Sequence, residues 1–129
     1  TATEDAWMNA VLAMARVADA EAVQTAFATA LRHWPDNLSA AVGLANQLHA
    51  RGQLAQAQQV LEEARRRHPR SAIVTNNLAQ VLSDLGRPQE ALKVIDEVAA
   101  DTSNPFAAEI RATRESIVQR LRERGTTAR

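Results

Sequence analysis

GLANQLHARGQLAQA (residues 43–57) and NLAQVLSDLGRPQEA (residues 77–91) lie 34 residues apart and follow one pattern. Self-similarity at a fixed interval of about 20–50 residues indicates a repeat architecture, in which stacked copies bury apolar faces that one copy cannot bury alone. The sequence therefore predicts an array of similar units. The pairs that are identical in this register are Leu44/Leu78, Ala45/Ala79, Leu48/Leu82, Gly52/Gly86 and Ala57/Ala91.

Proline and glycine residues divide the repeating stretch into helices. Pro35 and Pro69 are 34 residues apart, Pro105 follows 36 residues later, and Gly52 and Gly86 lie between them. Proline ends a helix because it lacks the amide donor, and glycine turns the chain after a helix at little steric cost. The spacing predicts seven helices, at about 3–17, 20–33, 37–51, 53–67, 71–85, 88–100 and 105–123.

Small polar residues stand where five of these helices should begin. Such residues cap a helix by accepting a hydrogen bond from a backbone amide of the first turn, and proline suits the first helical position. The expected N-caps are Thr3, Asp19, Asn37, Ser71 and Asn104, and the expected first-turn prolines are Pro88 and Pro105.

The composition indicates an all-α class and excludes several functions. Alanine, leucine, arginine, glutamine and glutamate dominate, and aromatic residues make up only 3% of the 129-residue chain. These are helix formers, and β-branched residues are too few for a sheet. Fifteen basic residues balance fifteen acidic ones. Since nucleic-acid binders usually carry a basic surplus, we expect no nucleic-acid partner.

Other features of the composition limit location and chemistry. Cysteine is absent, which excludes disulfides, thiolate metal sites and a cysteine nucleophile within this chain. No apolar run approaches the roughly 18 residues that span a bilayer, so membrane insertion is not expected. The chain begins at Thr1 without a signal segment, and we expect it to be a piece of a longer protein. Its location stays open between the cytoplasm and the periplasm.

The 34-residue helix–turn–helix unit closed by proline resembles the tetratricopeptide repeat (TPR) family, whose pattern has Trp, Leu-Gly and Tyr in the first helix and Ala, a bulky residue and Pro in the second. The first repeat matches with Trp7, Ala10-Val11, Met14, Val23, Phe27, Ala30 and Pro35. The second matches with Ala41, Leu44-Ala45, Leu48, Ala57, Leu61, Ala64 and Pro69. The third matches with Thr75, Leu78-Ala79, Leu82, Ala91, Ile95 and Val98, and its proline is displaced to Pro105.

This resemblance implies a right-handed α-solenoid of three helical hairpins, at about 4–36, 37–70 and 71–104. The last helix, 105–123, departs from the repeat and has one apolar stripe with a charged reverse side, which is typical of a capping helix that seals a stack against water. We expect a single domain over 1–124 and a frayed tail over 125–129. The apolar residues of the capping helix are Phe106, Ile110, Ile117, Val118 and Leu121.

A narrower resemblance concerns the surroundings of the array. The stretch ALRHWPDNLSAAVGLANQLHARG, together with NNLAQVLSDLGRPQEAL, is similar to the C-terminal TPR region of certain bacterial cysteine-peptidase-like envelope proteins. In such proteins the catalytic domain precedes the array. The catalytic cysteine and histidine would then lie outside this chain, so the resemblance implies no activity here.

The TPR resemblance also implies a binding surface, because the first helix of each hairpin lines the concave side of the superhelix. Val42, Asn46 and His49, spaced four and three apart, share a face that differs from the inward face of Leu44 and Leu48. Carboxamides beside apolar residues suit the backbone of an extended or helical peptide, although the same residues also suit an ordinary solvated face. The predicted groove residues are Met8, Leu12, Val42, Asn46, His49, Ile73, Asn76, Asn77 and Gln80.

Three sharper alternatives are disfavoured by the residues. A clamp for a terminal carboxylate needs lysines on the first helices, yet Met8, Ile73 and Asn77 occupy the places of the basic residues. When the alignment is shifted by one repeat, Asn46, Asn77 and Arg111 fit the clamp. Val42 and Ala107 then stand where lysines belong. The basic run Arg65–Arg70 ends a helix, where cations complement the helix dipole. The histidines, His33, His49 and His68, have no metal-ligand spacing, so no metal ion or cofactor is expected.

The sequence thus predicts a non-enzymatic interaction module that binds a protein or peptide in a concave groove. The alternative is a structural prop or self-association element for a neighbouring domain. Homo-oligomerisation would then use the N-terminal end of the array, around Ala6, Ala10 and Ala13.

Overall fold

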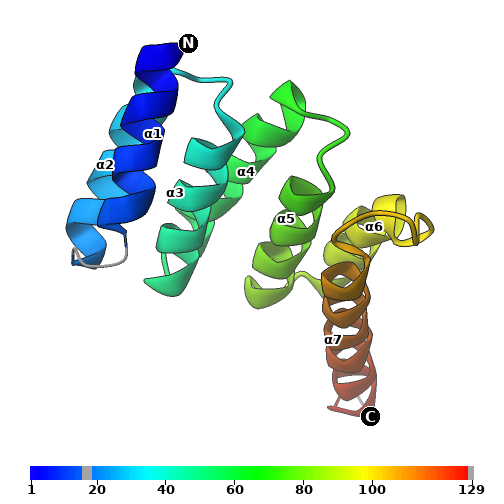
Figure 1. The fold of residues 1–129 in the computed structure, drawn as a ribbon. Helices are drawn as coiled ribbons and strands as arrows, with labels where there is room; N and C mark the ends of the chain where they lie inside the picture. The colour runs from blue at the N-terminus through cyan, green and yellow to red at the C-terminus, as the bar shows by residue number, and fades with distance from the viewer. Residues whose placement is uncertain (16–18, 128–129) are drawn as a thin grey trace. The chain divides into compact units, whose positions relative to one another are not determined.

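The computed structural model describes residues 1–15 and 19–127, which form seven α-helices and no strand (Figure 1). The predicted all-α class and the number of helices are therefore confirmed. The part of the first predicted helix that falls on residues 16 and 17 lies outside the described residues. The helices are α1 (Ala2–Met14), α2 (Ala20–His33), α3 (Leu38–Ala50), α4 (Leu54–Arg67), α5 (Ala72–Asp84), α6 (Pro88–Ala99) and α7 (Ala107–Thr127).

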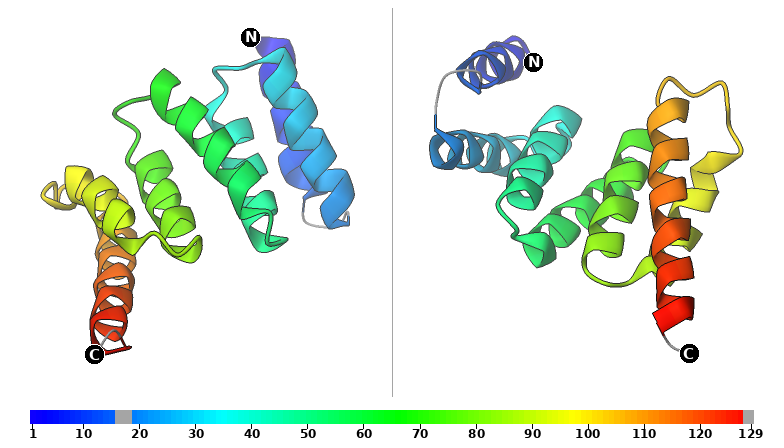
Figure 2. Two further views of the ribbon diagram at one scale, coloured as in Figure 1. Left: turned by 180° about the vertical axis from the view of Figure 1, so that it is seen from behind. Right: turned by 90° about the horizontal axis from the view of Figure 1, so that it is seen from below.

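The chain divides into two compact units, Thr1–Arg67 and His68–Arg129. In the first unit α2 contacts both α1 and α3, and α3 packs against α4. In the second unit α6 packs against both α5 and α7, and α5 also contacts α7, as the views from behind and from below show (Figure 2). Each unit therefore buries its own apolar residues within its own set of helices.

Glycine forms the turn within the second and the third hairpin, as the sequence predicts. Gly52 and Gly86 have φ angles of +76° and +81°, a left-handed conformation that glycine adopts without steric cost. The amide of Gln53 donates to the carbonyl of Leu48 at 2.8 Å, and the amide of Arg87 donates to that of Leu82 at 2.9 Å. Both helices thus end in a Schellman motif, in which the turn satisfies carbonyls that the helix leaves open.

The predicted N-caps are correct for three helices and wrong for two. Asp19, Asn37 and Ser71 each accept a hydrogen bond from a backbone amide three residues later. The N-cap of the first helix lies two residues earlier than expected, because Thr1 and Glu4 form a reciprocal capping box, so Thr1 and not Thr3 is its N-cap.

The last helix begins later than expected. Asn104 accepts a hydrogen bond from the amide of Phe106 at 2.7 Å, which holds this stretch in a local turn, and α7 starts only at Ala107. Asn104 is therefore not the N-cap, and Pro105 is not at the first helical position. At its other end α7 continues to Thr127, past the expected end at 123, and the tail residues 128 and 129 lie outside the described residues.

Buried apolar side chains fill the space between the helices of each unit. In the first unit Phe27 on α2 packs directly against Gly43 on α3, where a side chain would overlap its ring. In the second unit Ile95 on α6 is fully buried, together with Ile110 and Ile117 on α7. Ile110 and Ile117 thus form the inward stripe predicted for the last helix, whereas Phe106 lies outside that helix and is exposed.

Candidate functional site

The predicted groove residues of the first unit lie on α1 and α3. Among the described residues of this unit, Leu12 is the most exposed large apolar one, with 47% of its surface accessible, and Asn46 is also exposed. Val42 and His49 are half-buried, while Met8 is buried. Leu12, Val42, Asn46 and His49 therefore have accessible surface, whereas Met8 has almost none.

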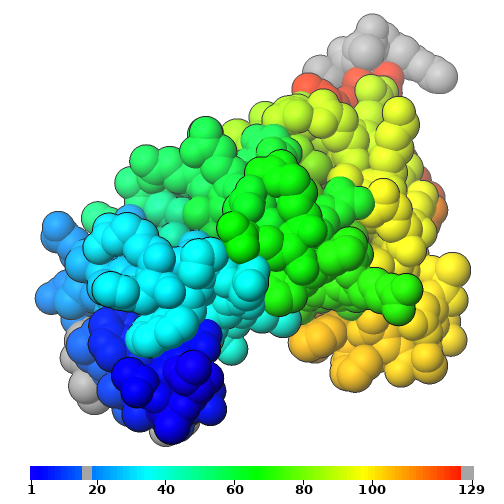
Figure 3. All heavy atoms as spheres, turned by 90° about the horizontal axis from the view of Figure 1, so that it is seen from above, coloured from blue at the N-terminus to red at the C-terminus, as the bar shows by residue number. Residues whose placement is uncertain are grey.

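The start of α1 is held against the first turn of α3. The Nδ2 group of Asn37 donates to Oε1 of Glu4 at 2.8 Å, while Oδ1 of the same asparagine caps α3. In the space-filling view, the start of α1 and the connection from α2 to α3 form one continuous surface (Figure 3). This link fixes the two helices that carry the groove residues of the first unit.

The predicted groove residues of the second unit lie on α5 and are mostly buried. Asn76 and Asn77 are 3% and 9% exposed, Ile73 is half-buried, and Gln80 is exposed. The Nε2 group of Gln80 donates to Oγ1 of Thr113 at 3.2 Å, which ties α5 to α7. Gln80 and Ile73 are therefore the predicted residues of this unit with accessible surface.

Asn76 has an unusual environment for a buried amide. Its Nδ2 group donates to Oδ1 of Asn77 at the long distance of 3.4 Å, and its own Oδ1 has no hydrogen-bond partner. A buried carbonyl without a donor destabilises the fold, because it loses its bond to water and gains none. Burial of consecutive polar residues is not expected from the sequence, since asparagine usually lies at the surface.

The described residues lack the features that a carboxylate clamp, a metal site or a membrane-spanning helix requires. Arg111 is exposed on α7, and Val42 and Ala107 supply no charge, so the described first helices present no set of lysines for a terminal carboxylate. No three His, Asp or Glu side chains are grouped closely enough there to hold a metal ion. Within the same ranges, no helix is long and apolar enough to cross a membrane.

The aromatic residues at the end of the first hairpin pack on one another. The ring centroids of Trp7 and Trp34 are 6.0 Å apart, and those of His33 and Trp34 are 5.8 Å apart. Both tryptophans are half-buried. Trp34 therefore packs against the rings of Trp7 and His33.

The first unit also contains a hollow of about 280 Å³ that sequence reasoning missed. It lies between the ends of α2 and α4, with α3 beneath, and its wall is almost wholly apolar. A signal for it exists in the sequence, because Ala41 occupies the place that Trp7 holds in the first repeat. The residues that line the hollow are Leu31, Pro35, Ala41, Gln59, Val60, Glu63, Ala64 and Arg67.

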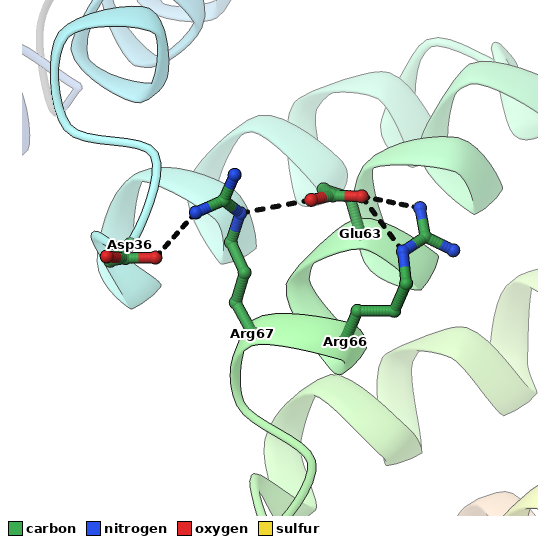
Figure 4. Close-up of polar contacts among 4 residues, drawn as sticks. All are labelled: Asp36, Glu63, Arg66 and Arg67. Carbon is green, nitrogen blue, oxygen red and sulfur yellow. Dashed lines mark hydrogen bonds and ion pairs between the residues drawn. The ribbon is translucent and has the colours of Figure 1, made fainter.

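Two residues that line this hollow, Glu63 and Arg67, belong to a group of ion pairs (Figure 4). Arg67 donates to Asp36 at 2.7 Å and to Glu63 at 3.0 Å, and Arg66 pairs with the same Glu63. The hydrogen bond from Arg66, reinforced by its charge and by Arg67, lowers the pKa of Glu63. The hydrogen bond to Asp36 is the main cause that raises the pKa of Arg67. Two residues of the basic run are thus neutralised by carboxylates of the same unit.

The second unit has a larger and more polar hollow of about 530 Å³ near the turn between α5 and α6. Arg120 on α7 reaches Oγ of Ser83 at 3.2 Å and Asp84 at 2.8 Å across it. Glu123 and Arg124 stand at its edge. Because opposite charges already face each other here, this hollow has no single charge preference for a ligand.

Comparison with known proteins agrees with the helical hairpins. The family profile described as "Tetratricopeptide repeat" matches residues 11–74 and 48–113. No curated protein sequence matches the chain.

Three solved structures have the same fold at low sequence identity. The Sgt2 TPR domain from Aspergillus fumigatus superposes with a TM-score of 0.86 at 17% identity, over 100% of this chain and 85% of that one. The type III secretion translocator chaperone SycD from Yersinia enterocolitica has a TM-score of 0.80 at 16% identity, over 93% and 95% of the two chains. The Pseudomonas aeruginosa pilF protein has a TM-score of 0.79 at 21% identity, and the match covers 92% of this chain but only 54% of that protein.

Proposed function

Because the chain belongs to the tetratricopeptide repeat family, we propose that it is a non-enzymatic module that binds a peptide or partner surface on the first helices of its hairpins. The expected groove would use α1 and α3 in the first unit and α5 in the second. The observation that carries the proposal is that these helices expose both kinds of side chain: Leu12 on α1 and Asn46 on α3 are exposed, and Val42 on α3 is half-buried. Such a surface binds an apolar side chain and a backbone amide together.

The rigidity of these helices supports the same function. Asn37 ties α3 to α1 through Glu4, and Gln80 ties α5 to α7 through Thr113. A surface that is already ordered loses little conformational entropy when a ligand binds. Neutral amides and apolar groups predominate on it, so we expect a ligand that is recognised by its backbone and its apolar side chains rather than by a terminal charge.

The proposal is tested by affinity capture from the native host with two altered domains. The first carries Val42→Arg, Asn46→Arg and Gln80→Arg on the first helices. The second is a matched control with the same added charge on exposed positions of the second helices, Thr25→Arg, Gln56→Arg and Gln89→Arg. Circular dichroism first establishes that both variants are as helical as the parent.

We expect a partner that binds the parent and the control but not the first variant. The partner is then reduced to a peptide, whose affinity is measured by titration calorimetry with the same three proteins. A partner that the first variant retains and the control loses would contradict binding on the first helices.

The alternative function, a prop or self-association element, has one observation in its favour. Ala6, Ala10 and Ala13 are exposed on α1 together with Leu12, so this helix has small apolar residues open to solvent. Sedimentation velocity of the domain and of its Ala10→Arg variant separates the two functions. A dimer that dissociates in the variant would favour self-association through α1, whereas a monomer at all concentrations would exclude self-association.

A further inference from the structure

The apolar hollow of the first unit lies away from the proposed peptide surface. Its floor is formed by Ala41 and Ala64, which are buried, and its walls by Leu31, Pro35 and Val60. None of the nine predicted groove residues lines it. An apolar hollow of about 280 Å³ is close to the lower end of small-molecule sites, so it has room for one large side chain.

The repeat register explains why the hollow exists. Trp7 in the first repeat and Ala41 in the second stand 34 residues apart, at the same place in the first helix. Trp7 packs against the end of its own second helix, where its ring meets Trp34. Ala41 faces the corresponding end of α4, near Ala64 and Arg67, but has no ring to fill the space. The hollow therefore lies beside the position at which the first repeat has an indole.

Arg67 at the edge of the hollow decides which kind of side chain fits best. Its guanidinium is bonded through edge N–H groups to Asp36 and Glu63, and the side chain is 37% exposed. Hydrogen bonds of this kind lie in the plane of the guanidinium and leave its faces for stacking. A guanidinium face at the edge of an apolar hollow can stack on the face of an aromatic ring.

We propose that this hollow is a second binding site, which takes one aromatic side chain of a partner polypeptide. The ring replaces the missing tryptophan above Ala41, is enclosed by Leu31 and Val60, and stacks against Arg67. Aromatic anchors of this kind, buried in a pocket with a polar rim, carry much of the binding energy of protein interfaces.

The site is tested with N-acetyl-tryptophanamide as the probe and N-acetyl-alaninamide as its control. Amide chemical shifts of the ¹⁵N-labelled protein are followed as each compound is added. We expect saturable shifts at the amides of Leu31, Ala41, Val60 and Ala64 with a Kd on the order of 1 mM for the tryptophan compound. The alanine compound should bind at least about tenfold more weakly, because it lacks the ring that fills the hollow.

Three variants locate the binding. Ala41→Trp fills the hollow from within, so we expect loss of probe binding with an unchanged or higher Tm. Val60→Glu, at a half-buried wall position that tolerates a charge, should also abolish binding and provides the test if the first variant does not fold. Asn46→Arg, on the proposed peptide surface, should leave probe binding unchanged, which separates this site from the proposed function.

Several results would overturn the assignment. Among them are the absence of saturable shifts, shifts that persist in Ala41→Trp and Val60→Glu, and shifts centred on Leu12 and Val42. The exposed Phe106 of a second copy is another ring that could enter the hollow. If the chain self-associates, and both Phe106→Ala and Ala41→Trp abolish that association, the hollow binds a second copy, and its assignment to a separate partner is overturned.

Discussion

At the scale of single residues, Gly43 shows how tightly the first unit is packed. A Cβ atom at this position would overlap the ring of Phe27, which is itself buried. We expect Gly43→Ala to destabilise the domain, because overpacking costs about 1–3 kcal/mol and exceeds the roughly 1 kcal/mol that alanine contributes to a helix. Urea unfolding measures the change.

The double variant Phe27→Leu/Gly43→Ala is the control for that substitution. Leucine at position 27 is smaller than phenylalanine and leaves room for the added methyl group. Gly43→Ala should therefore lower the free energy of unfolding by less in this background than in the parent. An equal cost in both backgrounds would contradict a clash between the two residues.

Asn76 leads to the opposite expectation. Its buried Oδ1 has no hydrogen-bond partner, so removal of the amide relieves a desolvation cost. We expect Asn76→Leu, which has nearly the same shape, to raise the free energy of unfolding by about 1 kcal/mol. Thermal and urea unfolding of the variant test this, and a large destabilisation would mean that Asn76 is satisfied in solution.

The lowered pKa of Glu63 predicts how the stability of the domain depends on pH. Hydrogen bonds and charge from Arg66 and Arg67 lower the pKa of this carboxyl below its ordinary value of 4.5. A lowered folded-state pKa means that the unfolded state binds the proton more tightly, so the stabilisation is present above about pH 4.5 and is lost as the pH falls through the folded-state value.

Glu63→Gln isolates that contribution. We expect the variant to lose less stability than the parent between pH 6 and pH 3. Urea unfolding at each pH measures this loss. Gln59, on the same face of α4, provides the matched control through Gln59→Ala, which should keep the full pH dependence. The same acid sensitivity in all three proteins would contradict a role for Glu63.

At the scale of helices, the caps contribute unequally. Ser71 only caps α5, whereas Asn37 caps α3 and also donates to Glu4 on α1. We expect Asn37→Ala to cost about 2 kcal/mol and Ser71→Ala about 1 kcal/mol, because the first substitution removes two hydrogen bonds. Equal costs in urea unfolding would show that the link to α1 contributes nothing.

The helices were largely predictable because their signals are local. α2 has the predicted ends, and no end of α3 to α6 differs from its prediction by more than one residue. The agreement is close because Pro, Gly and N-cap residues act within one turn. The start of α7 was not predictable in this way. An asparagine such as Asn104 can cap a helix or form a local turn. In the structure its side chain accepts a hydrogen bond from the amide of Phe106, which forms the turn.

The candidate site was less predictable than the helices. Spacing places Asn46, Asn76 and Gln80 on the first helices, but it does not tell which of them neighbouring helices cover. Asn76 is only 3% exposed, while the other two remain exposed. The hollow above Ala41 was missed because the repeat alignment shows that the ring of Trp7 is absent there, but not whether neighbouring side chains fill the space that it leaves.

At the scale of the whole molecule, the 34-residue period predicts the family, and the family profile and the solved structures agree with it. A repeat array depends on contacts between neighbouring helices, so a period of hydrophobic positions is enough to indicate its fold. It does not indicate the partner, because arrays of one pattern present different side chains on the same helices.

The most direct test of partner binding on the first helices is site-specific photo-cross-linking in the native host. A photoreactive phenylalanine analogue is placed singly at four exposed positions, Asn46 and Gln80 on first helices and Gln56 and Gln89 on second helices. We predict that one partner protein is captured at positions 46 and 80 and not at 56 and 89. Capture of the partner at 56 and 89 alone would contradict the proposed binding surface.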